Sequence, residues 1–288
     1  MIIIEHADSP HLHLAGGKGI SLLRLERLYT NIPKFFVLCP EAEEDIDGAA
    51  PAVLEAFDKL GVSRVAVRSS ASVEDQHRTS FAGQFETRLN VTRDSLLSAI
   101  HFVYASRRAL RVQSYSEAHQ LDHSSIQMSI VVQCLIPGDV SGVCFSRYVH
   151  NDRLGIVEAC WGLGESIVSG KETPDRYIFE RNNTNRIVET TIGNQLYMVS
   201  PESEIDYEKV NREWNSDHNT QSLVPTHKRL RKKLLDKEIS QVAELALHIE
   251  KQENYSCSDI EFCFHDGKLY LLQARPGPEA NVRGELVA

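Results

Sequence analysis

The chain has 288 residues, which suits one large domain or two modest ones, and its 42% hydrophobic and 25% charged residues are typical of a globular protein. The 31 Lys and Arg residues are outnumbered by 40 Asp and Glu residues, which gives a formal net charge of −9 and argues against a nucleic-acid-binding protein. No apolar stretch approaches the roughly 18 residues that a membrane span needs, and Glu5 follows the apolar start of the chain too soon for a signal peptide.

The 6 cysteines are scattered along the chain, and no two of them form a Cys-x-x-Cys pair. Several lie inside apolar runs, as Cys134 does in residues 132–136. Buried free thiols in the reducing cytoplasm explain this usage better than disulfides or a zinc site would. We therefore expect a cytoplasmic protein that does not span a membrane.

The N-terminal third is predicted to mix helices with short strands. Helical patterns begin at the glycine-rich residues 15–19, at Pro51 and after Asp94, which is expected to cap its helix. Gly61 is expected to end the second helix. The strand patterns are short apolar or alternating runs, at 35–38, 64–68 and 85–91.

The rest of the chain is predicted to be rich in strands and to end with a long helix and a hairpin. Strand patterns lie at 126–136, 141–146, 155–160 and 176–180. Residues 182–226 are polar and weakly patterned, so we expect an irregular connection or a mobile flap there. Apolar residues at helical spacing predict a helix over 228–252, and the basic run 227–233 is expected to form a solvated face of that helix.

A β-hairpin is predicted where residues 259–264 and 268–275 flank His265, Asp266 and Gly267. A two-residue turn would mix polar and apolar side chains on each face, whereas a three-residue loop with a left-handed Gly267 would separate them. We therefore predict the three-residue loop. The expected core face carries Ile260, Phe262, Phe264, Tyr270, Leu272 and Ala274, and the other face carries Glu261, Cys263, Leu271, Gln273 and Arg275.

The polar face of this hairpin could bind a metal ion and a phosphate. Glu261 offers a carboxylate and Gln273 an amide oxygen on adjacent strands, and such hard oxygen ligands suit a Mg²⁺ ion that bridges phosphates. Arg275 could stabilise the charge that develops on a transferring phosphoryl group. The alternative, from spacing alone, is a surface Glu–Arg pair beside an uninvolved Gln.

Three further stretches carry groups that could meet a phosphate. Residues 16–19 (GGKG) precede a helix, so backbone N–H groups and Lys18 could bind an anion, although a flexible helix entry explains the pattern equally well. Residues 161–165 (WGLGE) follow a strand and could bring backbone close to a phosphate, or they could simply form a tight strand exit. Arg68 lies at a strand end beside Ser hydroxyls, which are suitable phosphate donors but are also common in loops.

Several motifs, in a fixed order, resemble the ATP-binding domain of pyruvate phosphate dikinase, phosphoenolpyruvate synthase and rifamycin phosphotransferase. They are AVRSSASVED at 66–75, SFAGQFET at 80–87, CWGLGESIVSG at 160–170, TPDRY at 173–177, DIE at 259–261 and LLQARP at 271–276. The resemblance implies an α+β, ATP-grasp-like fold in which two lobes clamp ATP and Mg²⁺. The implied parts are a first lobe over 1–122, a second lobe with the metal-binding hairpin over 123–280, and a C-terminal tail over 281–288.

The resemblance also implies roles for the residues that match the family's motifs. The implied catalytic residues are Arg275, Lys18 and Arg68, of which Lys18 and Arg68 contact the phosphates. Gly83 and Thr87 are implied to belong to a loop that closes over the nucleotide. The implied adenine contact is Gln133, and the implied metal ligands are Glu261 and Gln273, in agreement with the argument from the hairpin.

Relatives of this kind normally continue into a swivelling domain with a phosphorylatable His, and no such motif occurs between Pro276 and Ala288. We therefore expect an ATP- and Mg²⁺-dependent phosphotransferase subunit that passes a phosphoryl group to a His on a separate partner protein or to a small-molecule acceptor. The first alternative is a non-catalytic nucleotide-sensing or assembly subunit. A direct small-molecule kinase or an ATP-grasp ligase is a further alternative.

Overall fold

The computed structural model describes residues 3–72, 86–108, 126–168, 170, 172–199 and 221–277. The chain forms two compact units, Met1–Leu135 and Ile136–Ala288. This boundary lies later than the one expected between 122 and 123, because the strand Met128–Cys134 pairs on both sides with strands of the first unit. The expected tail at 281–288 lies outside the described residues.

The first unit is built on a 5-stranded sheet with the order β1-β2-β5-β3-β4. Every neighbouring pair of strands is antiparallel. The strands β3 and β5 are buried along their whole length, because helices cover the sheet on both sides. The bounds are β1 (Ile3–Ile4), β2 (Phe35–Leu38), β3 (Val65–Ala71), β4 (Thr87–Val91) and β5 (Met128–Cys134).

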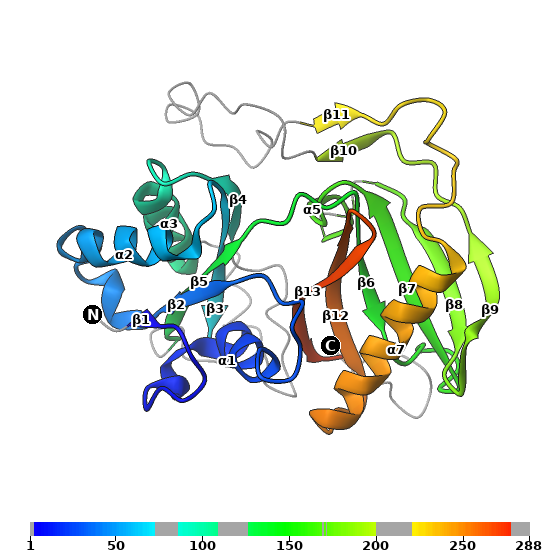
Figure 1. Ribbon diagram of the computed structural model, residues 1–288, viewed down its shortest axis with the longest axis horizontal. Coiled ribbons are helices and arrows are strands. Elements are labelled where there is room, and N and C mark those ends of the chain that lie inside the picture. Colours follow the sequence, from blue (N-terminus) through cyan, green and yellow to red (C-terminus); the bar gives the residue numbers. More distant parts are fainter. Residues whose placement is uncertain are drawn as a thin grey trace. The chain divides into compact units, whose positions relative to one another are not determined.

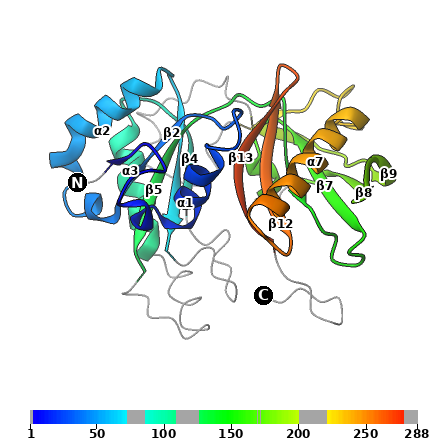
Figure 2. The same ribbon diagram turned by 60° about the horizontal axis from the view of Figure 1, so that its bottom comes forward.

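The helices of the first unit lie on opposite faces of this sheet, as Figure 2 shows. The helices α2 and α3 pack on the face that carries Phe36, Val67 and Val132, and α1 packs on the face that carries Val37 and Val131. Alternate residues of a strand point to opposite faces, so each strand contributes to both cores. The bounds are α1 (Gly16–Leu25), α2 (Ile46–Leu60) and α3 (Leu96–Ala105), with 3-10 turns at Leu12–Leu14, Pro40–Glu43 and Ser106–Arg108.

Two of these helices begin at residues other than those predicted. The helix α2 starts at Ile46 rather than Pro51, because the Asp45 carboxylate accepts a hydrogen bond from Gly48 N at 2.9 Å and caps the helix. Its end at Gly61, which adopts a φ of 70°, confirms the prediction. The helix α3 has Ser95 rather than the predicted Asp94 at its N-cap position.

The second unit is built on a 6-stranded antiparallel sheet with the order β13-β12-β6-β7-β8-β9. The helix α7 (Asp236–Gln252) packs across one face of this sheet (Figure 1). Both units combine helices with antiparallel sheets, which confirms the predicted α+β class. The bounds are β6 (Val140–Phe145), β7 (Leu154–Trp161), α5 (Glu165–Val168), β8 (Asp175–Glu180), β9 (Asn183–Thr191), β12 (Ser258–His265) and β13 (Lys268–Pro276).

The stretch 182–226, which we predicted to be irregular, contains strands. The strand β9 pairs with β8 at the edge of the sheet, and β10 (Tyr197–Val199) pairs with β11 (Gln221–Leu223) in a separate 2-stranded sheet. Most side chains of β9 are exposed and polar, so the strand lacks the apolar alternation by which strands are predicted. Paired backbone, rather than buried side chains, defines this strand.

The basic run 227–233 does not form a solvated helical face. The helix α7 begins only at Asp236, where the Glu238 side chain accepts a hydrogen bond from Leu235 N at 2.7 Å. Within the run, Lys233 Nζ lies 2.5 Å from Asp175 Oδ1, and both side chains are 0% exposed. The prediction was therefore wrong for Lys233, because a buried carboxylate compensates its charge.

The β12–β13 hairpin has a different register from the predicted one. Asp266 and Gly267 form a two-residue turn, since His265 pairs directly with Lys268. A β-bulge then places Leu272 as an extra residue, because Phe262 pairs with Leu271 but Glu261 pairs with Gln273. The predicted three-residue loop was wrong, and Leu271 is buried opposite Phe262 rather than lying on the polar face.

All 6 cysteines are free and buried, which confirms the expectation of buried thiols. Burial raises the pKa of Cys39 to about 11 and that of Cys160 to about 12, so both stay protonated near neutral pH. Within the described ranges, no helix is both long enough and apolar enough to cross a membrane.

Candidate functional site

The glycine-rich entry to α1 is held against β3. Gly16 adopts a φ of +68°, and a Cβ at this position would lie 2.0 Å from Ser70 O, so the close approach requires glycine. The Ser70 hydroxyl donates to Ala15 O at 2.7 Å and accepts a hydrogen bond from Gly19 N at 3.0 Å. Lys18 lies half-buried in the first turn of this anchored helix, so its position is set by the strand beside it.

Three of the predicted nucleotide-binding residues lie on neighbouring strands of the first unit. Arg68 alternates with Val67, which faces the α2–α3 core, so Arg68 points to the face that α1 covers. Its Nη1 donates to Gln133 Oε1 at 3.2 Å, and both residues are buried. Thr87 pairs with Arg68 across β3 and β4 and is exposed. The remaining predicted residue of this group, Gly83, lies outside the described residues.

Glu261 and Gln273 lie directly opposite each other on β12 and β13. The Ser258 hydroxyl donates to Ala246 O of α7 at 2.7 Å. The odd-numbered residues at this end of β12 therefore point to the sheet face away from α7. Directly opposed side chains have Cβ atoms about 4.5–5.5 Å apart, so the carboxylate and amide oxygens of this pair reach the same space.

Asp259 and Arg275 form the next opposed pair along the hairpin. Arg275 Nε and Nη2 lie 2.7 and 2.6 Å from Asp259 Oδ2. Burial raises the pKa of the Asp259 carboxyl, Arg275 opposes the rise, and the Glu261 carboxylate adds to it. Arg275 therefore offsets part of the cost of burying the Asp259 carboxylate, and Asp259 in return fixes the orientation of the guanidinium beside Glu261 and Gln273.

Asp259 is a residue of this site to which we assigned no role from the sequence. It lies two positions before Glu261, so the alternation of a strand already places both carboxylates on one face. That alternation was the available signal. It does not by itself show that Asp259 contacts Arg275, because the contact depends on the register that the β-bulge creates.

The glycine-rich stretch 161–165 is a tight strand exit. Gly162 N donates to Asp139 O at 3.0 Å, and Leu163 N donates to Val199 O at 3.0 Å. Gly162 adopts a φ of +83°, and a Cβ there would lie 2.4 Å from Val199 O. These two N–H groups already have acceptors within the protein, which argues against the phosphate-binding interpretation at Gly162 and Leu163.

The two groups of residues offer complementary chemistry. The first unit supplies cationic side chains, Lys18 and Arg68, which suit phosphate oxygens. The second unit supplies the oxygen donors of Glu261 and Gln273, and a carboxylate with an amide oxygen fits Mg²⁺, which binds one or two such ligands together with substrate phosphates. Arg275 adds a guanidinium beside these donors, as stabilisation of a phosphoryl group would require.

Comparisons with known proteins identify the family to which these motifs belong. Residues 40–285 match the family described as pyruvate phosphate dikinase, AMP/ATP-binding domain. Lys18 precedes the matched range, and the other predicted site residues lie within it. A D-alanine–D-alanine ligase from Bacillus anthracis aligns with 92% of this chain and 57% of its own chain, at 12% identity and a TM-score of 0.38.

Two relatives cover most of this chain. The uncharacterized phosphotransferase YvkC of Bacillus subtilis is 32% identical over an alignment of 292 residues, and this alignment covers 91% of this chain and 33% of that protein. A probable phosphoenolpyruvate synthase of Methanothermobacter thermautotrophicus is 34% identical over 262 residues, which span 88% of this chain and 35% of that protein. The chain thus spans about a third of the length of these relatives, and it belongs to the family of pyruvate phosphate dikinase AMP/ATP-binding domains.

Proposed function

We propose that this protein is an ATP- and Mg²⁺-dependent phosphotransferase of the dikinase type with an ATP-grasp-like fold. The family description names AMP and ATP, and the relatives are named a phosphotransferase and a phosphoenolpyruvate synthase. The observation that carries the proposal is the direct opposition of Glu261 and Gln273 next to the Asp259–Arg275 ion pair. Oxygen ligands beside a fixed guanidinium suit phosphoryl transfer from a metal-bound nucleotide.

In the first unit, we assign nucleotide binding to the face of the sheet that α1 covers. Lys18 and Arg68 supply positive charge for the phosphates. The hydrogen bond from Arg68 to Gln133 orients the Gln133 amide, which we assign to the adenine. We also assign Thr87, the first residue of β4, to nucleotide binding together with Gly83.

In the second unit, we assign phosphoryl transfer to the polar face of the β12–β13 hairpin. Glu261 and Gln273 would hold Mg²⁺, which when bound neutralises phosphate charge. Arg275 binds the phosphoryl group as its charge develops. Asp259 positions Arg275 through the contact between its Oδ2 and Nε, so its role is exerted through another residue.

The acceptor in this proposal is a His on a partner protein or a small molecule. The two relatives described above align with this chain over 33% and 35% of their length. About two thirds of each relative lies outside this match and offers room for the acceptor functions. We place the reaction in the cytoplasm, because 6 free cysteines suit a reducing compartment.

Incubation of the protein with ATP and Mg²⁺, followed by separation of the nucleotides over time, tests the proposal. AMP as the product supports the dikinase reaction. ADP supports the alternative of a small-molecule kinase. ATP binding without turnover in the presence of candidate acceptors favours a nucleotide-sensing or assembly subunit, and the absence of both binding and turnover would contradict nucleotide chemistry altogether.

The variant Glu261→Gln tests the metal-binding role directly. It removes the carboxylate charge but keeps the size of the side chain, so we expect Mg²⁺-dependent turnover to fall about 100-fold. The matched control is Glu189→Gln, an exposed position on β9 of the same sheet, where we expect no change. Equal turnover in both variants would remove Glu261 from the site.

A further inference from the structure

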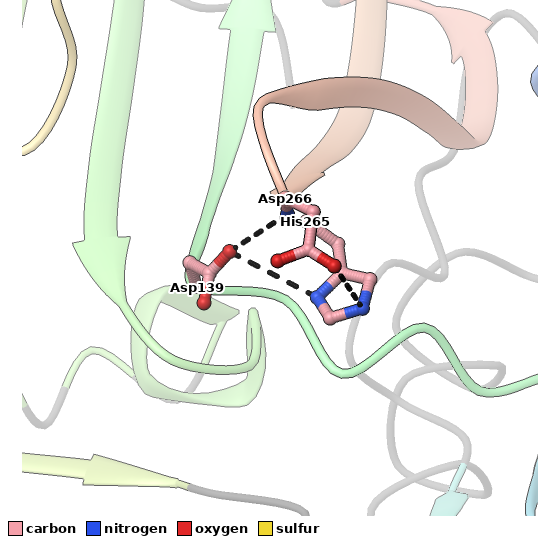
Figure 3. A group of neighbouring side chains, drawn as sticks. All are labelled: Asp139, His265 and Asp266. Carbon is pink, nitrogen blue, oxygen red and sulfur yellow. Dashed lines mark hydrogen bonds and ion pairs between the residues drawn. The ribbon is translucent and has the colours of Figure 1, made fainter.

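A second cluster of metal-ligating side chains lies at the turn of the β12–β13 hairpin. Asp139, His265 and Asp266 each offer a ligand atom there, and these atoms lie within 4.8 Å of one another. Figure 3 shows the Asp266 carboxylate beside the imidazole ring, with the Asp139 carboxylate approaching from the other segment. Along β12, His265 is about 13 Å from Glu261 at the usual rise of a strand, so this cluster is separate from the Glu261–Gln273 pair.

Hydrogen bonds fix the backbone of this cluster. Asp266 N donates to Asp139 Oδ2 at 3.0 Å, and Asp139 N donates to Phe264 O at 2.8 Å. Asp266 and Gly267 adopt φ values of 49° and 70°, as a two-residue type I′ turn requires. Asp139 is thus tied to the hairpin from both sides, so the binding of an ion would require little further ordering of this residue.

The imidazole provides an observation independent of the acidic groups. The His265 side chain is 32% exposed, yet its Nδ1 is buried and has no hydrogen-bond partner among the described residues. Nδ1 lies 3.8 Å from Asp139 Oδ2, which is too far for a hydrogen bond, and Nε2 lies 3.6 Å from Asp266 Oδ2. A buried ring nitrogen without a hydrogen-bond partner is unfavourable, and an ion between Nδ1 and the carboxylate would satisfy both groups.

We propose that Asp139, His265 and Asp266 bind one Zn²⁺ ion. Imidazole nitrogen and carboxylate oxygen bind Zn²⁺ at about 2.0–2.2 Å, which places two ligand atoms of a tetrahedral site about 3.3 Å apart. The observed 3.8 Å between His265 Nδ1 and Asp139 Oδ2 requires a small approach. The exposed Asp266 carboxylate, which lies 3.6 Å from Nε2, would have to turn toward the same ion, because one ion binds only one nitrogen of the ring. Mg²⁺ prefers oxygen ligands throughout, so the imidazole selects a transition metal, and three protein ligands leave one position for water.

Titration of metal-free protein with Zn²⁺, followed by calorimetry, tests this site, and Co²⁺ in place of Zn²⁺ reports its ligands by visible absorption. We expect one binding event in the parent that is weakened at least about tenfold in His265→Ala and in Asp266→Asn. The Asn variant keeps the size of Asp266 and tolerates its positive φ. Circular dichroism of both variants separates a lost ligand from a lost fold.

His101→Ala is the matched control. His101 Nε2 lies 3.3 Å from Asp47 Oδ1 at the surface of the first unit, and we expect its loss to leave Zn²⁺ binding unchanged. Zn²⁺ binding of equal strength in the parent and His265→Ala, or no binding by the parent, would overturn the proposal. The titration contains no nucleotide, so its outcome is independent of the proposed phosphotransferase activity.

Discussion

Two aspartates of the 6-stranded sheet each pair with a basic side chain, but their surroundings differ. The Asp175–Lys233 pair is 0% exposed on both sides, and Asp175 also accepts a hydrogen bond from Gly193 N at 2.9 Å. In the Asp259–Arg275 pair the carboxylate is buried, whereas the guanidinium side chain is 29% exposed. A pair that is enclosed on all sides is inaccessible to a ligand, so its role is limited to the fold. A pair that is open on one side can also present its cation to a ligand.

The two pairs also differ in what they connect. Lys233 Nζ bonds to Asp175 on β8 and to Gly193 O at 3.1 Å, so it joins the sheet, the segment after β9 and the segment before α7. Asp259 and Arg275 lie on strands that backbone hydrogen bonds already join. The first pair therefore holds together parts of the chain that are far apart in sequence, and the second adds orientation to an existing hairpin.

Disruption of the enclosed pair is expected to have the largest effect. Lys233→Met removes the ammonium group and leaves the Asp175 carboxylate buried without its counter-ion, so we expect the free energy of unfolding to fall by about 3–5 kcal/mol in urea denaturation. Lys232→Met is the matched control, because Lys232 pairs with Asp236 near the surface. We expect it to change the free energy of unfolding by at most about 1 kcal/mol, and equal losses in the two variants would contradict the contrast.

Alteration of the open pair is expected to affect turnover more than stability. Arg275→Lys keeps the charge but loses the planar group that contacts Asp259 through two nitrogens. We expect ATP turnover to fall about 100-fold, with the free energy of unfolding changed by about 1 kcal/mol. Arg186→Lys, in the exposed pair with Glu180, is the control and should alter neither. A large loss of stability with normal turnover would give Arg275 the same structural role as Lys233.

The partly buried Glu250–Arg181 pair gives the smallest expected effect, which is a dependence of stability on pH. Burial raises the pKa of Glu250, but hydrogen bonds from Arg181, at 2.7 and 2.9 Å, and from Ser146 outweigh burial and hold this pKa below 4.5. Because the pKa is lower in the folded state than in the unfolded state, the stabilisation is present above pH 4.5 and is lost as the pH falls through the folded-state pKa.

Denaturation of Glu250→Gln and the parent at neutral pH and at about pH 3 measures this effect. We expect the variant to be about 1 kcal/mol less stable at neutral pH, and we expect the difference to shrink in acid. Glu189→Gln, at an exposed position of the same sheet, should show no such convergence. A difference between Glu250→Gln and the parent that is independent of pH would indicate lost packing rather than a lost charge.

The shared polar face of the β12–β13 hairpin could be predicted because alternation along a strand depends only on neighbouring residues. Glu261, Gln273 and Arg275 do lie on one face. The register at the turn could not be predicted in the same way. With the predicted three-residue loop, and equally with the observed two-residue turn and bulge at Leu272, these residues lie on one face of the hairpin. The pattern of apolar residues there does not distinguish the two.

Contacts between residues that are far apart in the sequence could not be predicted from local patterns. Lys233 looked solvated because its neighbours in the run 227–233 are basic, and its partner Asp175 lies 58 residues away. The hydrogen bond between Arg68 and Gln133 spans 65 residues. The family resemblance named both of those residues, but it is the pairing of β3 with β5 that brings them within hydrogen-bond distance of each other.

The extra residue Leu272 has a consequence for how this hairpin can evolve. If the two strands continued past Leu271 without a bulge, Leu272 would lie opposite Glu261 and Gln273 opposite Ile260, and the amide would share the face covered by α7. Because the register changes at the bulge, the pairing at the tip of the hairpin is set separately from the pairing at its base. Substitutions at His265 and Asp266 can remodel the tip while the base keeps its ligands, so the two ends are free to diverge at different rates.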